Sequence, residues 1–160
     1  MMMNEIIPTL SFDEIVVKLE HDILPTMQSW GKVLEHDFEN IQVKTDSNRS
    51  DNHPRSRDKH FYSIYVICSQ KGATKFPDYG DLTLSVDLVQ RDEGSHPIIS
   101  AEVGMLVDEE GEGDWGFNRI AKLFPDSQRV HDGIFEELEK SLPQLYQSLR
   151  TALEKSGINP

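Results

Sequence analysis

The chain has 160 residues, with 16 Lys and Arg against 28 Asp and Glu, which gives a formal net charge of −12. Apolar residues make up 37% and there are ten glycines, a composition near that of ordinary globular chains, so a largely disordered protein is excluded. The length favours a single domain over residues 1–160. The negative charge disfavours nucleic acids and anionic membranes as partners, because both attract proteins through clustered Lys and Arg.

The only cysteine is Cys68, so an internal disulfide is excluded. The first residues lack a basic region followed by a sustained apolar stretch, and we therefore expect no signal peptide. No apolar run approaches the roughly 20 residues that a membrane-spanning helix needs. We expect a cytoplasmic protein in which residues 1–8 are loosely ordered.

A first helix is predicted over residues 11–38. Ser11 and Glu14 have the spacing of a capping box, in which two side chains satisfy backbone N–H groups at a helix start. Pro25 lies inside this helix, and because proline lacks an N–H and its ring clashes with the carbonyl four residues back, we expect a kink or a split there. The apolar face of the helix recurs every three or four positions: Phe12, Val16, Leu19, Ile23, Met27, Trp30 and Leu34.

Two strands and a polar segment are expected next. Residues 41–44 alternate and predict a short strand, whereas residues 45–59 contain no large apolar side chain and are expected to form a flexible loop. Residues 60–69 carry aromatic and β-branched side chains on both alternating faces. This pattern favours a strand inside the sheet over an edge strand.

Two further strands are predicted from their alternation of apolar and polar residues, over 82–88 and 99–107. Short connections favour antiparallel neighbours, because parallel strands need long crossovers. One face of these strands is apolar and would be covered by helices. The opposite face is expected to present polar side chains to solvent or to a partner: Thr83, Ser85, Asp87, Ser100 and Glu102.

Residues 115–124 fit either a strand or a helical turn. The pattern of the residues after them predicts a C-terminal helix. Asp126 or Ser127 can cap the helix start. Pro143 interrupts the helical pattern, and Ser141 with Gln144 has capping-box spacing, so a fresh helix can begin there. The apolar side chains recur at helical spacing: Ile134, Phe135, Leu138, Leu142, Leu145, Leu149 and Leu153.

The order of these elements predicts the fold class. Both terminal helices need an apolar surface to cover, and the alternating strands offer one apolar face. We expect an α+β fold, a two-layer sandwich in which an antiparallel sheet of about four to five strands packs on long N- and C-terminal helices.

The sequence lacks the common nucleotide, zinc-peptidase and hydrolase motifs, so no cofactor is expected. An acidic turn imitates the first positions of an EF-hand calcium loop through Asp108, Glu110, Glu112 and Asp114. The imitation fails at the twelfth position, where Arg119 replaces the bidentate Glu. Weak calcium binding at 108–114 is therefore an alternative, and a charged hairpin tip is the simpler interpretation.

Three functional hypotheses follow. The leading one is a non-enzymatic protein-binding domain, such as an adaptor, a small chaperone or an inhibitor of the immunity-protein kind, with a partner that is basic. Trp115 is a candidate contact residue, because Trp is enriched at interface hot spots. A second hypothesis, an enzyme or small-ligand site, uses Asp87 and Glu102 as a carboxylate pair on the polar sheet face. Calcium binding is the third, and pairing of edge strands would give a homodimer.

Overall fold

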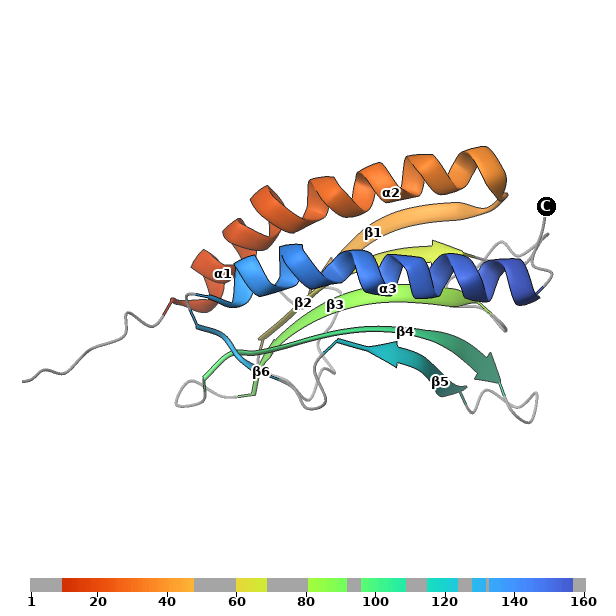
Figure 1. Ribbon diagram of the computed structural model, residues 1–160. Helices are drawn as coiled ribbons and strands as arrows, with labels where there is room; N and C mark the ends of the chain where they lie inside the picture. The colour runs from red at the N-terminus through yellow and green to blue at the C-terminus, as the bar shows by residue number, and fades with distance from the viewer. Residues whose placement is uncertain are drawn as a thin grey trace, which may run out of the picture.

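A computed structural model describes residues 10–47, 60–68, 81–91, 96–108, 115–123, 128–131 and 133–156. Five strands form an open antiparallel sheet, and the N- and C-terminal helices cover one of its faces (Figure 1). This confirms the predicted two-layer α+β fold. The elements in chain order are α1 (Phe12–Lys18), a π-helical turn η1 (Leu19–Ile23), α2 (Leu24–Asp37), β1 (Ile41–Ser47), β2 (His60–Cys68), β3 (Leu82–Gln90), β4 (Ile98–Asp108), β5 (Trp115–Lys122), β6 (Gln128–Arg129) and α3 (Ile134–Ser156).

The N-terminal helix begins and bends where the sequence predicts. The backbone N–H of Glu14 donates to Ser11 Oγ at 3.2 Å, and the N–H of Ser11 donates to Glu14 Oε1 at 2.9 Å, so the capping box is confirmed. Pro25 is the second residue of α2, directly after η1. Its missing N–H therefore falls where the regular hydrogen-bond ladder is already interrupted, which confirms a split near Pro25.

The five long strands pair in chain order, so the sheet is a meander, and β6 pairs only with the start of β4. The strand registers bring apolar residues together in a row across the sheet: Val43, Val66, Leu84, Val103 and Ala121. This row belongs to the core beneath the helices. As predicted, β2 lies inside the sheet, between β1 and β3.

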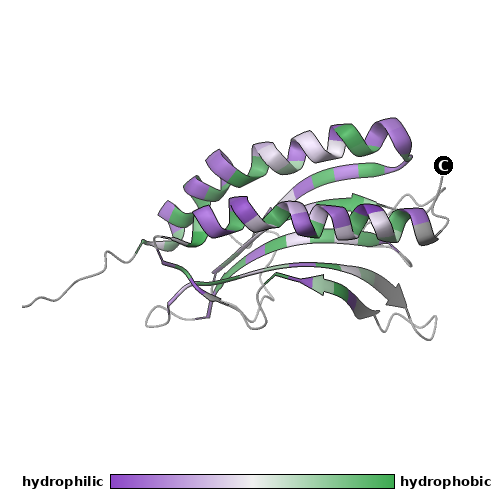
Figure 2. Cartoon of the chain, in the orientation of Figure 1, coloured by the Kyte–Doolittle hydropathy of each residue, from purple (hydrophilic) through white to green (hydrophobic). Residues whose placement is uncertain are grey.

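The helices contribute the apolar stripes that the periodicity predicts, and Figure 2 shows hydrophobic and hydrophilic residues alternating along them. Burial of these side chains against the sheet is the main contribution to stability, at about 25 cal/mol per Å² of apolar surface. The buried helical side chains include Ile15, Leu19, Ile23, Met27 and Leu34 from the N-terminal helix and Leu138, Leu142, Leu145, Leu149 and Leu153 from α3.

Two aromatic rings and an arginine join α2 to α3. Trp30 and Tyr146 stack with ring centroids 4.8 Å apart. Arg150 donates to Asp37 Oδ2 at 2.8 Å and to the Tyr146 hydroxyl at 3.3 Å, and its guanidinium lies 5.9 Å from the centre of the Phe38 ring. These contacts fix the two helices side by side on the sheet. Trp30 thus packs against the core, as its position on the apolar stripe predicts.

Several sequence-based boundaries need correction. Thr45–Ser47 belong to β1 instead of a loop, and residues 48–59 lie outside the described residues, as do residues 1–8. The segment that fits either a strand or a helical turn is the strand β5. Because α3 begins at Ile134, neither Asp126 nor Ser127 caps it.

The break predicted at Pro143 is also absent, because α3 runs through it without interruption. Leu142 and Leu145 on either side of the proline are both buried in the same core, whereas Pro143 itself is exposed. Packing of the apolar stripe on the sheet outweighs the local preference of Ser141 and Gln144 for a new helix start. Within the described residues, no helix combines the length and the apolar character that crossing a membrane requires.

Candidate functional site

The five polar residues predicted to share the helix-free face of the sheet do share it. In the register of β3 with β4, Ser85 lies opposite Glu102, Asp87 opposite Ser100, and Thr83 opposite Gly104. The expectation that all five are exposed is wrong, because Thr83 and Ser85 are only 4% and 6% exposed, while the other three are partly buried.

The curvature of the sheet explains this burial. Figure 1 shows β4 bowed toward the helices, so the helix-free face is the inner side of the bend. Short hydroxyl side chains at the bottom of such a surface are covered by longer neighbours. Ser85, for example, lies between Tyr65 on β2 and Glu102 on β4. We call this side of the sheet the concave face.

On the concave face, two hydrogen bonds hold the carboxylate of Asp87. Ser63 Oγ donates to its Oδ1 at 2.7 Å, and Ser85 Oγ donates to its Oδ2 at 3.0 Å. Burial raises the pKa of Asp87, the two serine hydroxyls oppose this shift, and the nearby charge of Glu102 adds to it. Asp87 can therefore hold a proton at a higher pH than an exposed aspartate.

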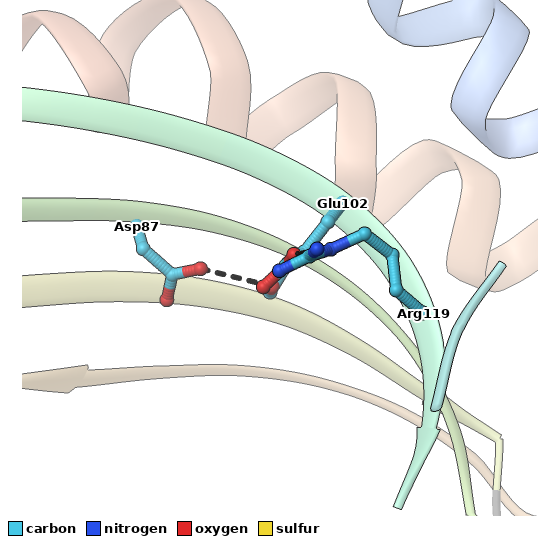
Figure 3. A network of polar contacts seen from close by, with 4 residues as sticks. Asp87, Glu102 and Arg119 are labelled. Carbon is cyan, nitrogen blue, oxygen red and sulfur yellow. Dashed lines mark hydrogen bonds and ion pairs between the residues drawn. The ribbon is translucent and has the colours of Figure 1, made fainter. Parts of the chain in front are cut away.

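Glu102 is paired with an arginine that sequence reasoning did not place here. Arg119 Nε donates to Glu102 Oε1 at 2.7 Å. The pairing of β4 with β5 shifts at Val103/Gly104, so Arg119 lies opposite Gly104 where regular alternation would put Ile120. This β-bulge turns Arg119 to the concave face, and Figure 3 shows Asp87, Glu102 and Arg119 on the same side of the strands.

The polar groups of Asp87 and Glu102 therefore find their partners within the concave face itself. Both carboxylate oxygens of Asp87 accept serine hydrogen bonds, and the charge of Glu102 is balanced by Arg119. Three cavities of the described part of the chain, beside α2, beside the start of α3 and beside its C-terminal half, include neither carboxylate. These hydrogen bonds join the polar side chains of the concave face into a network, and the raised pKa of Asp87 is the property that an acid–base site would use.

The remaining sequence candidates fall into two groups. Glu110, Glu112 and Asp114 lie outside the described residues, as do the side chains of Asp108 and Trp115. Cys68 is fully buried in the core, and burial, helped by the charge of Asp81, raises its thiol pKa to about 12. Among the described residues, no three His, Cys, Asp or Glu side chains gather closely enough to hold a metal ion.

A cavity of about 650 Å³ lies between the C-terminal half of α3 and one end of β3–β5. We call it the α3 groove. Its described lining is Leu82, Met105, Ile120, Gln144, Gln147, Ser148, Thr151 and Ala152. The strands provide an apolar floor and wall, the helix provides amides and hydroxyls, and none of these eight side chains is ionisable. Sequence reasoning missed this site, although the uncharged polar positions recur at helical spacing along α3.

Charge is distributed unequally between the two layers. Residues 12–37 and 134–156, which form the helical layer, contain ten Asp and Glu against five Lys and Arg. The described strands contain four of each sign. Nine of the ten helical acids are exposed, all except the half-buried Asp22. The excess negative charge of the described residues is therefore concentrated on the outer surface of the helices.

Comparison of the chain with protein-family models, with curated proteins and with solved structures found no match.

Proposed function

We propose that this chain is a non-enzymatic protein-binding domain whose acidic helical layer binds a basic partner. The observation that carries the proposal is the separation of charge, with ten acids against five bases on the helices and a balanced set on the described strands. A charge excess on one surface raises the rate of encounter with an oppositely charged protein and orients it. An adaptor, a small chaperone and an inhibitor of a basic protein all use such a surface.

Exposed apolar side chains on the same layer support the proposal. Val17 of α1 is 64% exposed and Val33 of α2 is 45% exposed, although both lie among charged residues. Interfaces combine charged rims, which set specificity and association rate, with apolar contacts that are buried on binding. The outer helical surface offers both kinds of group to a partner.

The test compares two variants of equal net charge. In the first, four exposed helical acids with no structural contact described above become amides: Glu35→Gln, Glu136→Gln, Glu139→Gln and Glu154→Gln. In the matched control, four acids from other parts of the chain are changed in the same way: Glu93→Gln, Glu109→Gln, Glu110→Gln and Glu112→Gln. Both variants have a net charge of −8, so only the location of the change differs.

Each protein is used as bait in a native lysate at low salt, and stoichiometric partners are identified by mass spectrometry. We expect a basic partner that the wild type and the control retain and the helical variant loses. Four surface ion pairs at about 0.5 kcal/mol each amount to about 2 kcal/mol, or a roughly 30-fold loss of affinity. Equal recovery by the two variants, or recovery of no stoichiometric partner, would contradict the proposal.

A further inference from the structure

The α3 groove differs in chemistry from the surface around it. The helical layer is acidic, yet the part of α3 that faces the groove presents Gln144, Gln147, Ser148 and Thr151. The volume of about 650 Å³ falls within the range of pockets that hold a drug-sized molecule. A groove whose described lining carries no ionisable side chain, in a chain with a net charge of −12, is suited to a ligand that carries no charge.

The apolar half of the groove rests on rigid elements. Leu82 at the start of β3 is fully buried, and Met105 of β4 packs against the core, so the floor is continuous with the interior of the domain. Ile120 forms the wall on β5 and is 47% exposed, because the β-bulge leaves it outside the regular pairing of β4 with β5. A ligand seated here would cover an isoleucine that the fold itself leaves open to water.

The opposite wall supplies hydrogen-bonding groups. Gln144 and Gln147 are exposed, and Ser148 and Thr151 are half-buried. Ser148 Oγ donates to the backbone carbonyl of Gln144 at 3.1 Å, which leaves its oxygen able to accept a hydrogen bond. Amides and hydroxyls can pair with a hydroxyl or carbonyl group, whereas a charge buried there would lack a counter-charge from the described lining.

From this geometry we infer that the α3 groove is a binding site for an uncharged amphipathic small molecule, with a hydrocarbon face against Leu82, Met105 and Ile120 and a hydroxyl or carbonyl edge toward α3. The inference is independent of the proposed partner surface, because it uses a different set of side chains. It also predicts discrimination against anions, since neither Lys nor Arg occurs in the described lining.

The test uses two dyes of similar size. Prodan is an uncharged naphthyl ketone, and ANS is a naphthalene sulfonate. Each dye is titrated into the full-length protein and excited directly. Ser148→Trp fills the groove, and Ser29→Trp makes the same change at an exposed position of α2. We expect saturable one-site binding of Prodan by the wild type and Ser29→Trp, and binding weaker by about tenfold or more in Ser148→Trp. ANS should bind the wild type at least about tenfold more weakly than Prodan does.

A second groove variant, Ile120→Gln, keeps the test decisive if Ser148→Trp does not fold, because the half-exposed Ile120 side chain tolerates a polar replacement. It should also weaken Prodan binding, with an unchanged far-ultraviolet circular dichroism spectrum. The inference is overturned if the folded wild type shows no saturable Prodan binding, if the groove variants bind Prodan as the wild type does, or if ANS binds as tightly as Prodan.

Discussion

Gly31→Ala tests how closely the N-terminal helix packs on the sheet. Gly31 is buried on the side of α2 that faces β1, and a Cβ atom added there would lie 2.6 Å from Val43 Cγ2. Ordinary van der Waals contacts begin at 3.4 Å, so the two groups would have to separate by about 0.8 Å in an interior that is close-packed. Val43 has a short β-branched side chain, which offers little freedom to move away.

Two opposing effects set how much Gly31→Ala changes the free energy of unfolding. Replacing glycine by alanine inside a helix stabilises it by about 0.5–1 kcal/mol, because the unfolded chain loses conformational freedom. Overpacking of a well-filled contact costs about 1–3 kcal/mol. We therefore expect Gly31→Ala to lower the free energy of unfolding by about 1 kcal/mol, which corresponds to a fall in melting temperature of about 2–4 °C for a domain of this size.

Urea unfolding followed by circular dichroism measures the change, and Val43→Ala provides the second side of a double-mutant cycle. In the Val43→Ala background the added methyl group has room, so Gly31→Ala should stabilise the chain by about 0.5–1 kcal/mol. If Gly31→Ala stabilises the wild-type chain, or if its effect is the same in both backgrounds, then the helix and the strand are not in the contact described here.

Two further predictions concern buried titratable groups. The pKa of Asp87 is raised above its ordinary value of 3.8 in the folded chain, so the folded state binds this proton more tightly and stability falls as the pH rises through the raised pKa. Asp87→Asn removes this titration, and we expect this variant to lose less stability than the wild type as the pH rises above about 4 in urea unfolding. An unchanged pH dependence would refute this prediction. Cys68, with its thiol pKa raised to about 12, should react with DTNB at pH 8 slower by about two orders of magnitude in the native chain than in urea. Comparable rates in the two conditions would show that the thiol is accessible.

Periodicity predicted the helices and strands that bury an apolar stripe, because such a stripe arises from the spacing of apolar residues within one element. The alternation in 82–88 and 99–107 correctly indicated one covered face, and the Ser11–Glu14 pair correctly marked the start of the first helix. Predictions were wrong where packing opposes a local signal. The helix through Pro143 continues because residues on both sides of the proline are buried in one core.

The sequence alone determined which residues share a face of the sheet, since a strand alternates its side chains with a period of two. Only the tertiary structure decided how exposed they are, because the bend of the sheet buries Thr83 and Ser85. The pairing of Arg119 with Glu102 and the exposure of Ile120 both follow from the bulge between β4 and β5. A bulge depends on how two strands pair, and no periodicity within one strand records it.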